Sequence, residues 1–189
     1  MSNARFHTGP WFPAKWRRLV YLAFLFFFMQ QKSVAQAPSA RAEQVKAAFI
    51  FHFTQFIKWP EDRFNGPAAP FVIGILGSDP FGSYLDKLLK GEKVNGHPIA
   101  VHRFANETEI GNCNILFVNK TATPDTLTAL HKRGTLTVSD WTDFMNSGGM
   151  VRFFRERNKV RFEINLSAAK EARLEISSKL LRLARIIEK

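Results

Sequence analysis

The chain has 189 residues, which is enough for one ordinary domain. Hydrophobic residues make up 46% of it, so we expect a buried core, and an intrinsically disordered chain is excluded. Its single cysteine excludes an intramolecular disulfide framework and the cysteine-rich metal modules. The formal charge of +11, taken over the whole chain, would favour nucleic acid or an anionic membrane as a partner.

Residues 1–35 have the three-part pattern of a secretory signal peptide. A basic region without acidic residues comes first, followed by the apolar run Leu19–Met29 and a region of small residues. A cut after Ala35 is preferred to one after Ala37, because the second would leave a proline at the start of the mature chain. The alternative is an uncleaved membrane anchor, which needs about 20 apolar residues. Since this run has only eleven, we expect a signal peptide at 1–35 and a single exported domain at 36–189.

Export changes the meaning of the charge. Removal of residues 1–35 takes away five basic residues and leaves 22 basic against 16 acidic residues, or +6. Residues 36–149 are neutral, and residues 150–189 hold 11 basic against 5 acidic residues. Chromosomal DNA is not available outside the cytoplasm, so no nucleic-acid partner is expected. The basic carboxy-terminal part is interpreted either as a solvated face or as a protein-docking surface.

A helix is predicted over Ala42–Lys58. Its residues Val45, Phe49, Phe53 and Phe56 recur at the spacing of one helical face, so this apolar stripe is expected to be buried. The Trp-Pro pair that follows ends the helix, because a residue before proline avoids the helical region.

The middle of the chain alternates strands with helices. Two apolar runs, Phe71–Leu76 and Asn114–Asn119, predict strands buried on both faces, and a further strand is expected at Thr135–Ser139. Helices are expected after the first two strands, with Asp79 as the N-cap of one and Thr123 as the N-cap of the other. The Asn-Gly pair at positions 95–96 predicts a type I′ turn between two short strands.

The carboxy-terminal part has the clearest local pattern. Apolar and polar residues alternate strictly from position 160 to 166, which predicts a half-buried strand. A turn at Arg157-Asn158 would pair it with the strand before it. The expected pairs are Phe153 with Phe162 and Val151 with Ile164 on the inner face, and Arg152 with Glu163 (an ion pair) and Phe154 with Arg161 (a cation–π contact) on the outer face.

Two helices are expected after this hairpin. Ser167 is the predicted cap of a short helix that reaches Arg173, and a closing helix is expected over Ser178–Ile187. The predicted fold is therefore a single α/β domain with a mixed β-sheet flanked by helices, a carboxy-terminal β-hairpin and a closing helix.

No pattern of catalytic residues is found, and no cofactor or metal site is expected. The junction at Gly77 has the spacing of neither a dinucleotide-binding turn nor a P-loop, and Asp79 at its mouth would repel a phosphate. The histidines lack the spacing of metal ligands, and His52 is expected to be a hydrogen-bonded core residue on the apolar stripe. Cys113 precedes a buried strand and is expected to be a packed small residue rather than a reactive thiolate.

Several segments resemble the YfiR-like family, in the order in which that family has them. They are Val45–Phe49 with Trp59-Pro60, Ile75–Gly82, Asn114–Val118, Gly148–Met150, Val160–Leu166 and Ser177–Ala184. The resemblance implies a small periplasmic α/β protein without known catalysis. The namesake of the family binds the periplasmic domain of an inner-membrane diguanylate cyclase and holds it inactive. A similar role in cyclic di-GMP signalling and biofilm formation is therefore implied for this chain.

The cysteines depart from the family pattern. Family members often pair a cysteine in the first strand with one just before the middle strand. Cys113 occupies the second of these places, whereas Gly74 stands at the first. The resemblance therefore does not extend to redox sensing through an intramolecular disulfide, and intermolecular oxidation of Cys113 stays open if its thiol is exposed.

Three function hypotheses follow. The first is a periplasmic regulator that docks on an inner-membrane sensor or diguanylate cyclase, with Arg161, Glu163, Asn165, Ser178 and Lys179 contacting that partner or supporting the contact surface. For Glu163 and Asn165 the alternative is that they only pair across the hairpin. The second is a small-ligand-binding module that uses the ends of the strands at 71–76 and 114–119. The third, an enzyme, has no motif in its favour, and a homodimer is left open.

Overall fold

The computed structural model describes residues 38–64, 66, 68–119 and 122–188. They belong to one compact unit of the chain, Ala37–Lys189. The expected signal peptide at 1–35 lies outside the described residues. Within the described ranges, the structure has no helix that is both long enough and apolar enough to cross a membrane.

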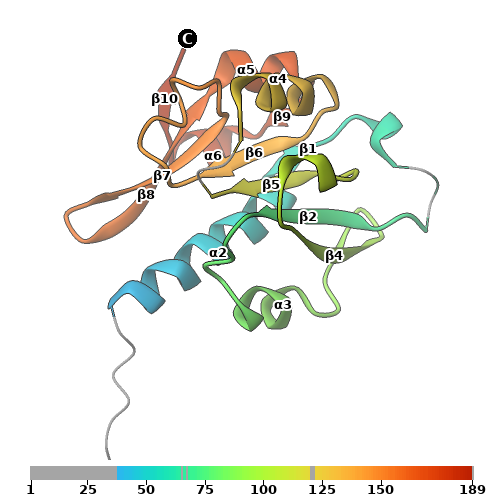
Figure 1. Cartoon of the computed structure of the whole chain (residues 1–189), viewed down its shortest axis with the longest axis horizontal. Coiled ribbons are helices and arrows are strands. Elements are labelled where there is room, and N and C mark those ends of the chain that lie inside the picture. The colour runs from blue at the N-terminus through green and yellow to red at the C-terminus, as the bar shows by residue number, and fades with distance from the viewer. Residues whose placement is uncertain (1–37, 65, 67, 120–121, 189) are drawn as a thin grey trace, which may run out of the picture. The chain divides into compact units, whose positions relative to one another are not determined.

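A mixed sheet of eight strands forms the centre of this unit (Figure 1). Its strands, in spatial order, are β10 (Arg185–Ile187), β8 (Lys159–Asn165), β7 (Val151–Glu156), β6 (Leu136–Ser139), β5 (Ile115–Val118), β2 (Phe71–Leu76), β4 (His97–Phe104) and β3 (Lys93–Val94). The five strands from β7 to β4 are parallel to one another. Strand β8 runs antiparallel to β7, β3 runs antiparallel to β4, and β10 runs parallel to β8.

Helices and short elements complete the unit. The helices are α2 (Pro38–Phe56), α3 (Ser83–Leu89), α4 (Pro124–Lys132), α5 (Leu166–Glu171) and α6 (Ser178–Leu181), with 3-10 turns η1 (Glu61–Arg63) and η2 (Glu107–Glu109). Two short strands, β1 (Ile57–Lys58) and β9 (Glu175–Ile176), pair antiparallel outside the main sheet. The predicted single α/β domain, with a mixed sheet flanked by helices and a carboxy-terminal hairpin, is confirmed.

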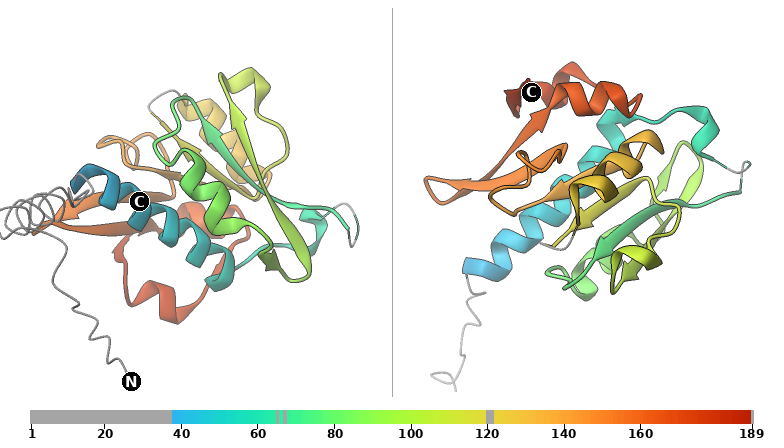
Figure 2. Two further views of the ribbon diagram at one scale, coloured as in Figure 1. Left: turned by 90° about the horizontal axis from the view of Figure 1, so that it is seen from below. Right: turned by 45° about the horizontal axis from the view of Figure 1, so that its top comes forward.

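Each face of the sheet has its own core. Alternate strand residues such as Ile73, Phe117 and Phe153 pack with α2, α3 and α6 into the larger core. The residues between them, among them Leu116, pack with α4 and with Phe144 into a smaller one. Figure 2 shows α2 and α3 side by side on one face of the sheet, which their packing against each other confirms.

The β7–β8 hairpin has the predicted register. Val151 pairs with Ile164 and Phe153 with Phe162, and these four side chains are buried in the larger core. Asn158, in the turn, adopts a left-handed conformation with φ 61°. Strict alternation carries this much information because a shift of one residue would turn every apolar side chain to the wrong face.

The buried face of α2 differs from the predicted stripe. Val45 is 38% exposed, whereas Ile50 is fully buried and Lys46 is only 8% exposed. Phe53 is buried as predicted, and Phe49 packs partly buried against the larger core. The buried face of α2 therefore includes Lys46, whereas the apolar pattern had predicted Val45 there.

Two predicted helix starts were wrong. Asp79 does not cap α3, because its Oδ1 atom accepts hydrogen bonds from the amides of Phe81 and Gly82, at 2.7 and 3.1 Å. The helix begins after Gly82, whose φ of 50° is one that glycine adopts readily. Likewise α5 is capped by Asn165 and not by Ser167, since Asn165 Oδ1 accepts a hydrogen bond from the Ala168 amide at 3.1 Å.

The closing helix predicted over Ser178–Ile187 was also wrong in its extent. Helix α6 is a single turn, and the chain then forms β10, which pairs with the outer edge of β8. Leu183, which the helical spacing would place on the same face as the buried Leu180, is 59% exposed. The physical reason is the edge of β8, because its backbone groups find partners in β10 that a longer helix would not supply.

Candidate functional site

The outer face of the hairpin carries a cluster of charged and aromatic side chains. Glu163 Oε1 lies 2.7 Å from Arg152 Nε, which confirms the predicted ion pair. Its other oxygen lies 3.8 Å from Arg185 Nη1 on β10. Phe154 pairs with Arg161 in the strand register, as predicted, but its cation–π contacts are with other residues, since the guanidinium carbons of Arg152 and Arg185 lie 5.7 and 4.4 Å from its ring centroid.

The candidate docking residues occupy different environments. Glu163 and Asn165 are 3% and 5% exposed, so their side chains hold the hairpin and α5 together from inside. Arg161 is exposed on the same strand, with its Nε atom 3.9 Å from Glu156 Oε2. Of the three candidate residues on β8, Glu163 and Asn165 are therefore buried and support the fold, whereas Arg161 is accessible to a partner.

Ser178 and Lys179 belong to another element. Both are exposed on α6, whose Leu180 is buried in the larger core. No hydrogen bond or ion pair joins either of them to Arg161 among the residues that the structure describes. The five predicted residues thus lie on two elements, three of them on β8 and two on α6.

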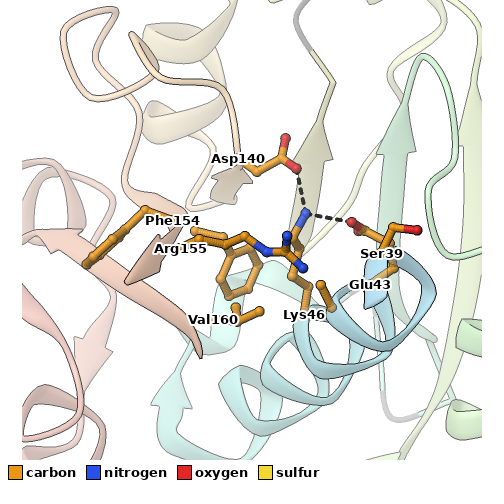
Figure 3. A pocket seen from close by; sticks show the side chains of 9 residues that line it. Ser39, Glu43, Lys46, Asp140, Phe154, Arg155 and Val160 are labelled. Carbon is orange, nitrogen blue, oxygen red and sulfur yellow. Dashed lines mark hydrogen bonds and ion pairs between the residues drawn. The ribbon is translucent and has the colours of Figure 1, made fainter. Parts of the chain in front are cut away.

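A hollow of about 320 Å³ lies between the first half of α2 and the end of β6 (Figure 3). Lys46 Nζ points into it and lies 2.9 Å from Glu43 Oε1 and 2.6 Å from Asp140 Oδ2. The second oxygen of Glu43 is buried and has no hydrogen-bond partner in the described part of the chain. Arg155 and Val160, from the two strands of the hairpin, close the other side.

A second and larger hollow, of about 480 Å³, lies against the same elements, and we call it the α2–hairpin groove. Four apolar side chains line it, Ala42, Val45, Phe49 and Val160. Three basic side chains line it as well, Arg41, Arg155 and Lys159, and no acidic residue is among the residues that line it. Ala42, Arg155 and Val160 also line the first hollow, so the two adjoin.

Sequence reasoning missed both hollows. Lys46 lies 94 positions from Asp140, and no local pattern connects the two. The one available signal was Lys46 itself, a charged residue next to Ala47 and Ile50 on an otherwise apolar helix face. A lysine is almost never buried without a counter-ion, so its position could have indicated an acidic partner elsewhere.

The structure differs from the sequence-based prediction at one histidine, His52. His52 is exposed and lies beside Phe51 and Phe56, so the prediction of a core histidine there was wrong. The buried histidine is His131, whose Nε2 lies 3.3 Å from Thr137 Oγ1, and burial lowers its pKa below the ordinary value of 6.5. In the described residues, no three His, Cys, Asp or Glu side chains lie close enough to hold a metal ion.

The ends of β2 and β5, the predicted ligand cleft, carry their own ion pairs. Asp79 Oδ2 lies 2.8 Å from Arg103 Nε, and Asp86 Oδ2 lies 2.6 Å from Arg103 Nη2. Asn119 donates a hydrogen bond to the Ser78 carbonyl across the two strand ends. The anion-binding position at this junction is thus taken by the carboxylate of Asp79.

Cys113 is 1% exposed, as predicted for a packed small residue. Position 74, where the family pattern implies a partner cysteine, is packed for glycine, because a β-carbon there would lie 2.8 Å from Leu116 Cδ1. Burial raises the pKa of the Cys113 thiol from 9.0 to about 11, and nearby Arg63 opposes this effect only in part.

Cys113 is therefore expected to be unreactive in the folded chain. The pKa change from 9.0 to about 11 lowers the thiolate population at pH 8 about 100-fold, and burial blocks access as well. Titration with a disulfide reagent at pH 8 should find no fast thiol in the native protein and one in guanidinium chloride. Equal rates in both solutions would show that the thiol is exposed and open to oxidation.

The chain is thus a small α/β protein with two adjoining surface hollows between α2 and the β7–β8 hairpin. The chain belongs to the YfiR/HmsC-like family, whose model matches residues 43–185. YfiR-like proteins are periplasmic and regulatory, and the family is connected with diguanylate cyclase signalling. No curated protein matches the chain.

Two solved structures are similar to this chain in outline. The ABC domain in complex with L-Trp from Streptococcus pneumonia has a TM-score of 0.48 and 13% identity, over 77% of this chain and 60% of that one. A conserved domain protein from Vibrio cholerae has a TM-score of 0.47 and 11% identity, over 76% and 59%. The chain thus spans about three-fifths of the length of each.

Proposed function

We propose that this protein is exported by residues 1–35 and restrains an inner-membrane diguanylate cyclase by binding the periplasmic domain of that cyclase. The observation that carries the proposal is the family match over residues 43–185, which spans the sheet from β2 to β8 and reaches into β10. The excess of basic residues at 150–189 supports a protein-docking role for this end of the chain.

Restraint of this kind requires differential affinity. A cyclase that exchanges between an inactive and an active arrangement is held inactive only if the regulator binds the inactive one more tightly. Arg161, Ser178 and Lys179 are exposed and are proposed to contact the partner. Glu163 and Asn165 are buried and are proposed to support that surface by fixing the hairpin and the start of α5.

Deletion of the gene in the native bacterium tests the proposal. Cyclic di-GMP should rise, and a second deletion, of the membrane cyclase responsible, should return it to the starting level. The full-length gene should complement the first deletion, whereas a gene without codons 2–35 should not, because its product stays in the cytoplasm. Unchanged cyclic di-GMP in the first deletion strain would contradict the proposed function.

A small-ligand-binding module is the second candidate, and the hollow at Lys46 favours it. That hollow contains an ammonium group between two carboxylates and one buried carboxylate oxygen without a partner. A ligand with a hydrogen-bond donor would match the unpartnered oxygen of Glu43. Thermal-shift screening against metabolites tests this, and a Tm that no compound raises would disfavour it.

A further inference from the structure

The α2–hairpin groove combines an apolar floor with a basic rim. Its floor includes Val45, one of the large hydrophobic residues that stand exposed in this structure, together with Phe49 and Val160. Figure 1 and Figure 2 show that the first half of α2 and the tip of the β7–β8 hairpin extend in the same direction from the sheet. The groove is thus bounded by two separate elements.

The groove has a basic rim, to which Arg41 and Lys159 belong. Arg41 and Lys159 are exposed, and neither forms an ion pair with another residue in the described ranges. Arg155 adds a third cation to the lining. Lys46, on the neighbouring turn of α2, is paired with both Glu43 and Asp140, and these three side chains line the adjoining hollow and add no positive charge to the groove. An acidic partner would therefore meet two cations, Arg41 and Lys159, that form no ion pair in the described ranges.

We infer that this groove binds an acidic amphipathic segment of the regulated membrane protein, with apolar side chains on the floor and carboxylates against Arg41 and Lys159. The inference rests on the proposed function and adds, to the contacts proposed at Arg161, Ser178 and Lys179, a groove that receives one segment of the partner. Concave shape favours a peptide segment over a lipid surface, because a flat bilayer cannot reach the floor of a hollow between a helix and a hairpin. A volume of about 480 Å³ accommodates several side chains of such a segment.

The binding energy has two sources with different signatures. Apolar contact with Val45 and Phe49 supplies affinity that salt does not screen. The pairs with Arg41 and Lys159 lie at an exposed rim, where salt screens them and where they act mainly on the association rate. Affinity for the segment is therefore expected to fall as ionic strength rises without disappearing.

The test uses the chain purified from the periplasm and the periplasmic domain of the cyclase that the double deletion identifies. Isothermal titration compares the wild type with the double variant Val45→Asp/Lys159→Glu. The matched control is Tyr84→Asp/Lys87→Glu on α3, because Tyr84 is 37% exposed, close to the 38% of Val45, and Lys87 is also exposed. Circular dichroism and Tm establish that both variants are folded.

We expect the groove variant to bind at least about tenfold more weakly and the control to bind within about twofold of the wild type. Equal affinity of the groove variant and the wild type would overturn the inference and leave the proposed function standing. If the wild type does not bind the cyclase domain, both fail together.

Other occupants of the groove would give different results. Flotation of the wild type with phosphatidylglycerol vesicles, lost in the groove variant while cyclase binding is kept, would assign the groove to a membrane and overturn the inference. A wild-type dimer that the groove variant converts to a monomer in sedimentation would overturn it too, by assigning the groove to a second copy of the chain.

Discussion

Replacement of Phe53 by alanine is expected to lower the free energy of unfolding by about 3–5 kcal/mol. The side chain is fully buried, and its ring centroid lies 6.0 Å from that of Phe153 and 5.4 Å from that of Phe162. Truncation would leave a cavity between α2 and the β7–β8 hairpin that rigid aromatic neighbours cannot fill. Guanidinium denaturation of the purified chain, followed by circular dichroism, measures the effect.

Tyr84→Ala is the matched control for this prediction. It also removes an aromatic ring, but Tyr84 is 37% exposed, so a loss of only about 0.5 kcal/mol is expected. If the two substitutions cost the same, the aromatic core between α2 and the hairpin would not hold the fold as described. A loss near the upper end would consume much of the stability of an ordinary domain, which is about 5–15 kcal/mol.

Glu163→Gln is expected to have the second largest effect, a loss of about 2–3 kcal/mol. Glu163 is 3% exposed and forms an ion pair with Arg152. The Arg152 side chain is only 18% exposed, so water can solvate its charge only in part. Loss of the negative charge leaves a largely buried guanidinium without a counter-ion. Chemical denaturation of the variant and the wild type under the same conditions measures the difference.

The hairpin supplies its own control for Glu163. Glu156 also pairs with Arg185, at 3.3 Å, but its side chain is 47% exposed, so Glu156→Gln should cost less than about 1 kcal/mol. The double variant Arg152→Met/Glu163→Leu removes both charges and should be more stable than Glu163→Gln alone. If it is the less stable of the two, the uncompensated charge of Arg152 is not the cause of the loss.

Local patterns predicted the hairpin well and the end of the chain poorly. The alternation at 160–166 contains both the strand and its register, because burial of one face leaves only one arrangement of the apolar side chains. The short strand β10 contains no such pattern, since its three residues become a strand only by pairing with β8. Leu183 and Ile187, which recur at a helical spacing, favoured a helix where tertiary pairing produced a strand.

In the candidate site, too, contacts within the hairpin were predicted and contacts between distant elements were not. The ion pair of Arg152 with Glu163 follows from the register and was predicted, whereas the approach of Arg185 depends on β10 and was not. The burial of Lys46 on α2 goes together with its ion pair to Asp140, a residue whose proximity only the folded sheet determines. The exposure of Val45, on which the α2–hairpin groove depends, could likewise not be predicted from the helix alone.

If this protein holds a diguanylate cyclase inactive by binding to it, the effect must be visible in the synthesis of cyclic di-GMP by the purified cyclase. The full-length cyclase, in nanodiscs that leave both of its faces accessible, is supplied with GTP in the absence and presence of the periplasmic chain. A saturating concentration of the chain is expected to lower the rate of synthesis about tenfold. An unchanged rate at saturation would contradict it.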